Sequence, residues 1–322
     1  MARKLKGKAG HQSLKATLQR HQNLEKLRRI HKRNEEIKKL KKSQPNAQVR
    51  KNQESQKVNE VRFVPFQENK TLLLVGEGDF SFTRSLVEQG YMKAENLIAT
   101  SYDASPAELE LKYPHSFKEN YDFLIENKVK ILFKVDATNL IKSFDLSKKK
   151  PWSKVLGPSW KQKSLQNIIF NFPHTGKGVK DQDRNIADHQ QLVLGYFRSC
   201  KKLFELVNAP IVQSRMSHNQ GYDLSEKLGG LTSEGYGKII LSVFTGEPYD
   251  SWMIKSLGKD CNLCVERSNK FQWNYYPQYH HRRTNSEQDT TKPAQQREAR
   301  IYVFQKFMRP QAKRKVESDD EA

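Results

Sequence analysis

The sequence contains little cysteine and no long apolar run. Three cysteines in 322 residues are too few for a disulfide scaffold, so the chain suits a reducing, intracellular compartment. No apolar stretch approaches the roughly 20 residues that cross a bilayer, and no apolar signal-peptide segment follows the basic start. These absences predict a protein without disulfides, without a membrane span and without a secretory signal.

Acidic residues are also scarce at the N-terminal end. None occurs before Glu25, and residues 1–60 hold 18 lysines and arginines against 5 acids, which is +13 of the net charge of +21. A mitochondrial presequence shares this shortage, but here lysine outnumbers arginine and the basic run continues to Lys57. An anionic membrane is disfavoured as the partner because the segment lacks the aromatic face of an interfacial helix. We therefore expect binding to nucleic acid, weakened by salt, and a location in the nucleus and nucleolus.

Composition divides the chain into three parts. Residues 1–60 are predicted to be a basic arm and linker for RNA binding and nucleolar targeting. The thin apolar stripe of this arm is too narrow for a core, so we expect a helical or disordered segment that orders only on a partner. Residues 61–309 carry the apolar runs of one folded domain, and residues 310–322 are predicted to be a charged, disordered tail.

Apolar runs in the folded domain alternate between strand-like and helix-like stretches. Strands are predicted at residues 71–75, 96–100, 128–134, 165–170, 237–244, 263–267 and 300–305. Helices are predicted at residues 81–89, 190–208 and 249–257, with insertions at residues 141–166 and 213–234. This alternation predicts an α/β fold with a mainly parallel, seven-stranded sheet and helices on both faces.

A glycine-containing turn follows the first predicted strand. Gly76 and Gly78 allow the backbone to bend sharply and approach a ligand, with the amides of the next helix pointing at it. A dinucleotide site would have a third glycine where this chain has Ser81. Glu77 and Asp79 place two carboxylates in the turn, which disfavours a pyrophosphate and favours a sulfonium and an α-amino group. The turn therefore predicts S-adenosylmethionine rather than NAD as the cofactor.

Two further acids follow the next two predicted strands. Asp103 is placed to accept hydrogen bonds from ribose hydroxyls, and Asp136, followed by Ala137, is placed near an adenine edge. Each acid alone is more often a helix cap or turn residue. Their positions at the ends of successive strands favour one adenosyl ligand.

The fourth predicted strand leads into Asn171, Phe172, Pro173 and His174. Proline and its aromatic neighbour can form a stacking wall, while the Asn171 amide offers a donor and an acceptor to a base edge. This loop is similar to the Asn/Asp-Pro-Pro-aromatic loop of nucleobase N-methyltransferases. We expect Phe172 to stack on the base and His174 or Asp79 to accept its proton, with water as the alternative acceptor. A purely structural turn is the other interpretation.

Aromatic and basic residues alternate between residues 271 and 283. This pattern is typical of surfaces that stack single-stranded bases and neutralise phosphates, and a lid over the core is the alternative. The candidate RNA contacts are Trp273, Tyr279, His281, Arg282 and Arg283, with Arg184 from a separate motif. Nearby, Cys261 and Cys264 precede two adjacent histidines, which cannot easily share one tetrahedral zinc ion, so we expect no metal.

These motifs together resemble the fungal 25S ribosomal RNA uridine-N3 methyltransferases. The matching segments are residues 1–8, 76–82, 100–103, 171–174, 182–185, 246–252 and 279–285, which span nearly the whole chain. The resemblance implies a Rossmann-like class I methyltransferase that modifies N3 of a uridine in large-subunit rRNA, within the pre-60S particle and the nucleolus. A non-catalytic ribosome-assembly factor that retains this fold is the alternative.

Overall fold

The computed structural model describes residues 63–217, 230–284 and 293–307, together with Glu25, Arg29 and Lys32. The chain divides into two compact units, Met1–Phe63 and Val64–Ala322. In the first unit, the Arg29 guanidinium lies 3.0 Å from the Glu25 carboxylate, one helical turn away. The rest of the predicted arm and the predicted tail lie outside the described residues.

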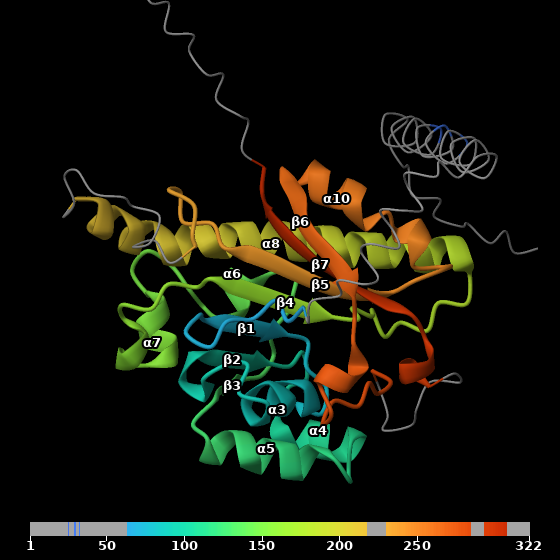
Figure 1. Ribbon diagram of the computed structural model, residues 1–322, viewed down its shortest axis with the longest axis horizontal. Helices are drawn as coiled ribbons and strands as arrows, with labels where there is room; N and C mark the ends of the chain where they lie inside the picture. Colours follow the sequence, from blue (N-terminus) through green and yellow to red (C-terminus); the bar gives the residue numbers. More distant parts are fainter. Residues whose placement is uncertain are drawn as a thin grey trace, which may run out of the picture. The chain divides into compact units, whose positions relative to one another are not determined.

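The second unit is built on a seven-stranded sheet of order β3-β2-β1-β4-β5-β7-β6 (Figure 1). Its strands are β1 (Leu72–Val75), β2 (Leu97–Thr100), β3 (Lys130–Leu132), β4 (Asn167–Asn171), β5 (Lys238–Phe244), β6 (Leu263–Lys270) and β7 (Ala299–Lys306). Strands β1 to β5 are parallel, and β7 runs antiparallel between β5 and β6. The predicted mainly parallel α/β sheet is confirmed. Because strand order reverses at β1 and β4, the crevice beyond their carboxyl ends is where such sheets bind ligands.

Helices cover both faces of the sheet. They are α3 (Ser81–Glu88), α4 (Pro106–Lys112), α5 (Phe117–Glu126), α6 (Leu140–Ser143), α7 (Trp152–Leu156), α8 (Gln182–Ser217) and α10 (Ile254–Asp260). Every residue of β1 is buried, as a strand with helices on both sides requires. Leu73 and Val75 point to the face whose core includes Phe197 and Phe204 of the long helix α8. Among the described residues, no helix is long and apolar enough to span a membrane.

The structure corrects several predicted elements. The segment at residues 141–166 is part of the core, not an insertion, because Trp152 and Trp160 are buried and pack edge to face at 6.1 Å. The helix predicted at residues 249–257 is a short 3-10 turn followed by α10, interrupted by Met253 with φ 54°. Helices α4 and α5 were not predicted. They form the crossover that leads from β2 to β3.

Candidate active site

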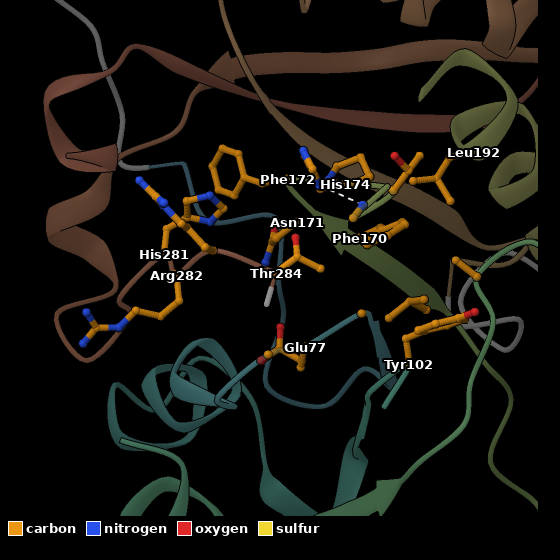
Figure 2. A pocket seen from close by; sticks show the side chains of 18 of the residues that line it. Glu77, Tyr102, Phe170, Asn171, Phe172, His174, Leu192, His281, Arg282 and Thr284 are labelled. Carbon is orange, nitrogen blue, oxygen red and sulfur yellow. Dashed lines mark hydrogen bonds between the residues drawn. The ribbon is translucent and has the colours of Figure 1, made fainter. Parts of the chain in front are cut away.

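A cavity of about 1290 Å³ lies at the carboxyl ends of the parallel strands. Most predicted site residues line it: Gly76, Glu77, Gly78, Asp79, Asp103, Asp136, Ala137, Asn171, Phe172, Pro173, His174, Tyr279, His281, Arg282 and Arg283. This volume exceeds the roughly 300–1,000 Å³ of a typical small-molecule site, so it has room for more than one ligand group. Figure 2 shows Asn171, Phe172 and His174 across the cavity from Glu77 and Tyr102.

Backbone geometry explains both glycines of the turn between β1 and α3. Gly76 has φ +72°, and a Cβ there would lie 2.5 Å from the Phe170 ring, so a side chain is excluded by conformation and by space. A Cβ at Gly78 would lie 3.1 Å from the Tyr113 hydroxyl. The two glycines therefore let the turn pass close to its neighbours at the cavity wall.

Glu77 is a buried acid in this turn, with only 8% of its surface exposed. Its Oε2 accepts hydrogen bonds from the Thr83 amide at 3.2 Å and the Thr83 hydroxyl at 2.9 Å. Burial raises the pKa of Glu77 to about 7; the Thr83 bonds oppose this rise and nearby Asp79 adds to it. The carboxyl is thus poised to ionise near neutral pH, and a cation beside it would favour the ionised form.

Asp79 and Ser81 hold the turn together. Asp79 Oδ1 accepts from the Ser81 amide at 3.1 Å and hydroxyl at 2.6 Å, and Oδ2 accepts from the Ser116 hydroxyl at 2.9 Å. Ser81 is buried and does not line the cavity; its hydroxyl oxygen accepts from the His280 amide at 3.2 Å. This position disfavours Ser81 as a cofactor contact, a role that stays a prediction. Asp79 accepts three hydrogen bonds within the turn and its surroundings, so it has a structural role there.

Asp103, after β2, and Asp136, after β3, both make contacts near their own turns and also line the cavity. Asp103 forms an ion pair with Lys112, and Lys112 also lies 3.3 Å from Glu108. Asp136 Oδ1 accepts from the amide and hydroxyl of Thr138, both at 2.8 Å. These contacts match the predicted turn role, while the position of both acids in the lining matches the predicted ligand role.

Tyr102 and Tyr113 line the cavity but were missed from the sequence. Tyr102 is 73% exposed, which is unusual for an aromatic ring at a cavity wall. Its position between the second strand and Asp103 is the sequence feature that could have identified it as a cavity residue. The Tyr113 hydroxyl donates to the Arg283 carbonyl at 2.9 Å and thereby ties residues 279–284 to helix α4. No local pattern marks that long-range contact.

Asn171 presents a buried amide at the end of β4. The Ser242 hydroxyl donates to Asn171 Oδ1 at 2.7 Å, and Nδ2 is buried with no hydrogen-bond partner in the described part of the chain. An unsatisfied buried donor costs about 1–3 kcal/mol, so its presence in a cavity wall indicates a ligand that carries an acceptor. The donor role predicted for Asn171 stays a prediction, and the unsatisfied Nδ2 is the observation that supports it.

The structure places Phe172 inside an aromatic cluster at the cavity wall, which disfavours its predicted stacking on a base; that role stays a prediction. The residue is 7% exposed and has φ 47°. Its ring stacks on Trp273 at 5.4 Å and 10°, and it packs on Phe244 at 4.6 Å and on His281 at 4.9 Å. Protein rings occupy the surroundings that the prediction assigned to the base. Phe172 instead supports the wall next to Asn171.

The structure also disfavours His174 as a general base. Partial burial and the neighbouring His189 both lower the pKa of His174, so the ring is neutral at neutral pH. Its Nδ1 accepts a hydrogen bond from the Gly176 amide at 2.9 Å. The neutral ring then carries its proton on Nε2, and its one lone pair is already engaged.

The predicted RNA contacts fall into two groups. Tyr279, His281, Arg282 and Arg283 line the cavity, and Tyr279 is buried beneath the segment, with its hydroxyl 3.2 Å from His281 Nδ1. Arg184 is exposed near the start of α8 and Trp273 lies behind Phe172; neither lines this cavity. The segment thus forms part of the cavity wall, and its contact with RNA stays a prediction.

Arg297 was missed altogether, although it lines the cavity. Its guanidinium carbon lies 3.5 Å over the Phe244 ring, and its Nη2 donates to the Tyr249 hydroxyl at 2.6 Å. Only the antiparallel pairing of Phe244 with Ala299 brings this residue to the cavity. A polar stretch ahead of the last strand gives no local signal for such a position.

Three features together define a Rossmann-like class I methyltransferase fold. They are the reversal of strand order at β1 and β4, the antiparallel β7, and the acid-bearing glycine turn after β1. Residues 73–283 match the family described as "rRNA (uridine-N3-)-methyltransferase BTM5-like". The chain belongs to this family. The predicted enzyme class, an rRNA uridine-N3 methyltransferase, is thereby confirmed.

Two relatives and one solved structure give the range of similarity. The Saccharomyces cerevisiae 25S rRNA (uridine(2634)-N(3))-methyltransferase is 51% identical over 100% of this chain and 99% of its own. The Arabidopsis thaliana uncharacterized protein At4g26485 is 29% identical over 65% of this chain and 79% of its own. A Streptococcus pneumoniae putative tRNA (m1A22) methyltransferase structure is 12% identical, with a TM-score of 0.35 over 76% of this chain and 68% of its own.

Proposed function

We propose that the protein transfers a methyl group from S-adenosylmethionine to N3 of one uridine in large-subunit rRNA, within the pre-60S particle. The uridine corresponds to the one named for the yeast relative, position 2634 of 25S rRNA. The observation that carries the proposal is the unsatisfied Asn171 amide, in the same cavity as the acidic glycine turn. A base-edge donor and a cation-binding wall are the two parts that this reaction needs.

The turn between β1 and α3 suits the charge of the proposed cofactor. Ionised Glu77 would balance the positive amino acid end, and Asp103 and Asp136 would receive the ribose and adenine. The exposed ring of Tyr102 offers a stacking face for the adenine. S-adenosylmethionine, when bound, supplies an electrophilic methyl group. Two carboxylates in the turn would repel the pyrophosphate of NAD.

The Asn171 amide fits the chemistry of uracil. N3 lies between two carbonyl groups on the pairing edge, so the nucleotide must be unpaired or turned out of its stack to react. Asn171 Nδ2 would donate to one of these carbonyl oxygens, which orients N3 and makes its proton more acidic. N3 gains the methyl group and releases this proton to water; His174 is not the acceptor, because its Nδ1 lone pair is engaged.

The basic residues at 1–60 would supply affinity for RNA and retention in the nucleolus, without a part in the chemistry. Their +13 charge suits phosphate neutralisation, which is independent of sequence and sensitive to salt. Selection of the uridine would then rest on the cavity in the second unit.

The test is methylation of an unmodified 25S rRNA transcript by the full-length protein with tritiated S-adenosylmethionine, followed by nucleoside analysis. We expect N3-methyluridine from the wild type. We expect a loss of about tenfold or more in kcat for Asn171→Ala, with cofactor affinity unchanged. Cofactor binding without any N3-methyluridine would contradict the proposal and favour a non-catalytic assembly factor.

A further inference from the structure

A second cavity of about 310 Å³ lies next to the first, and we name it the flanking recess. It is an open recess lined by the end of β6, by the 3-10 turns Trp273–Tyr275 and Ala294–Gln296, and by the two residues before β7. β7 pairs Phe244 with Ala299, and β6 pairs Lys270 with Arg300. This end of the antiparallel pair therefore lies at the same edge of the sheet as the carboxyl end of β5.

The side chains of the flanking recess match an unpaired nucleobase. Trp273 supplies an aromatic wall, and base–aromatic stacking contributes about 1–3 kcal/mol per base. Asn274 and Gln296 supply amides, each with a donor and an acceptor for a base edge. Lys270 is a cation at this wall, and Glu298 is the one acidic residue among the described residues that line it. Both amide side chains are exposed and can hydrogen-bond to a ligand, which makes a polar, planar ligand a better match than an apolar one.

Arg297 lines both cavities. The Phe244 ring beneath it, at 3.5 Å, and the Tyr249 hydroxyl, at 2.6 Å, fix its guanidinium from two sides. A planar guanidinium with several N–H donors suits the oxygens of a phosphate group. One phosphate joins any two neighbouring nucleotides in RNA. If each cavity held one nucleotide, the phosphate that joins them would therefore pass beside Arg297.

Trp273 connects the two cavities from the other side. Its ring stacks on Phe172 at 5.4 Å and 10°, and Phe172 lines the first cavity beside Asn171. A base on Trp273 would thus extend the aromatic cluster that supports the reaction loop. Occupation of the flanking recess would favour the arrangement in which Asn171 faces the target base.

We propose that the flanking recess binds the base directly next to the target uridine, and that Arg297 binds the phosphate between the two nucleotides. The inference rests on the proposed function. It adds that the enzyme recognises the nucleotide next to the target uridine as well as the uridine itself. Trp273 stacks on the flanking base, while Asn274 and Gln296 hydrogen-bond to its edge.

The test uses the full-length protein and synthetic RNA stem-loops that contain the counterpart of the uridine named for the yeast relative. One RNA is intact, and two carry an abasic nucleotide directly 5′ or 3′ of that uridine. kcat and KM for RNA are measured for the wild type, for the double variant Asn274→Ala/Gln296→Ala and for Gln89→Ala. Gln89 is exposed at the end of α3, outside both cavities, and serves as the matched control.

We expect one abasic RNA to lower kcat/KM of the wild type and of Gln89→Ala by about tenfold, through KM. The double variant should lower kcat/KM about tenfold on intact RNA and leave it unchanged on that abasic RNA, because its amides act only through the missing base. Equal losses on intact and abasic RNA, or no loss from either abasic site, would overturn the inference. Failure of the wild type to methylate any of the RNAs would instead overturn the proposed function.

Discussion

Replacement of Glu77 by glutamine distinguishes the effect of this buried acid on protein stability from its effect on cofactor binding. Glutamine has nearly the same shape, and its carbonyl oxygen can still accept the two hydrogen bonds from Thr83. The substitution therefore removes the charge and keeps the local contacts. It should make the free protein more stable at neutral pH and make cofactor binding weaker.

The magnitude follows from the pKa of Glu77, which burial raises from 4.5 to about 7. Because the folded state holds this proton more tightly than the unfolded state, the penalty is absent below about pH 4.5 and complete above about pH 7. This difference in pKa between the unfolded and folded states lowers the free energy of unfolding by about 3 kcal/mol at pH 8 and by less than about 1 kcal/mol at pH 5. Glu77→Gln should raise the free energy of unfolding by up to these amounts.

The assay is urea unfolding of the full-length protein at both pH values, without cofactor. Glu126→Gln, which changes an exposed acid of α5, is the matched control and should leave stability unchanged at either pH. Titration with S-adenosylmethionine should show affinity that rises with pH in the wild type and stays flat in Glu77→Gln. At pH 8 the variant should bind roughly tenfold or more weakly. A variant that is less stable than the wild type at pH 8, or equally shifted at both pH values, would refute the reasoning.

Three further predictions concern the turn, the reaction loop and the arm. Gly76→Ala should abolish cofactor binding, measured by calorimetry, because its Cβ would meet the Phe170 ring; full affinity in a folded variant would contradict this. His174→Ala should keep kcat within about threefold at all pH values, since its lone pair is engaged; a larger loss that recovers at high pH would identify a general base. Deletion of residues 1–60 should weaken RNA binding and flatten its salt dependence while cofactor affinity is kept; an unchanged salt slope would exclude the arm from RNA binding.

The sequence predicts the central strands well because β1, β4 and β5 carry short runs that are mostly apolar and buried. Residues 238–244 and the run before Gly76 are buried on both faces, so their composition alone identifies them. Other elements depend on tertiary contacts. Trp152 and Trp160 lie in a lysine-rich stretch, and only their packing with each other and with Phe144 shows that the stretch belongs to the core.

The candidate site divides in the same way. The acids and glycines were predictable, because they directly follow strands whose ends meet at one edge. The aromatic surroundings of Phe172 and the position of Arg297 were both missed, and for a common reason. Trp273, Phe244 and Arg297 come from segments up to 125 positions away from Phe172, and the antiparallel pairing of β7 brings them together. Local sequence patterns carry no information about that convergence.

The most direct test of the central claim is the methylation state of a single nucleotide in cells. In cells that lack this protein, N3-methyluridine at the counterpart of the uridine named for the yeast relative should be absent from mature large-subunit rRNA. Wild-type protein should restore it, and Asn171→Ala, expressed at the same level, should not. Full methylation in cells that lack the protein, or in cells that express only Asn171→Ala, would contradict the account.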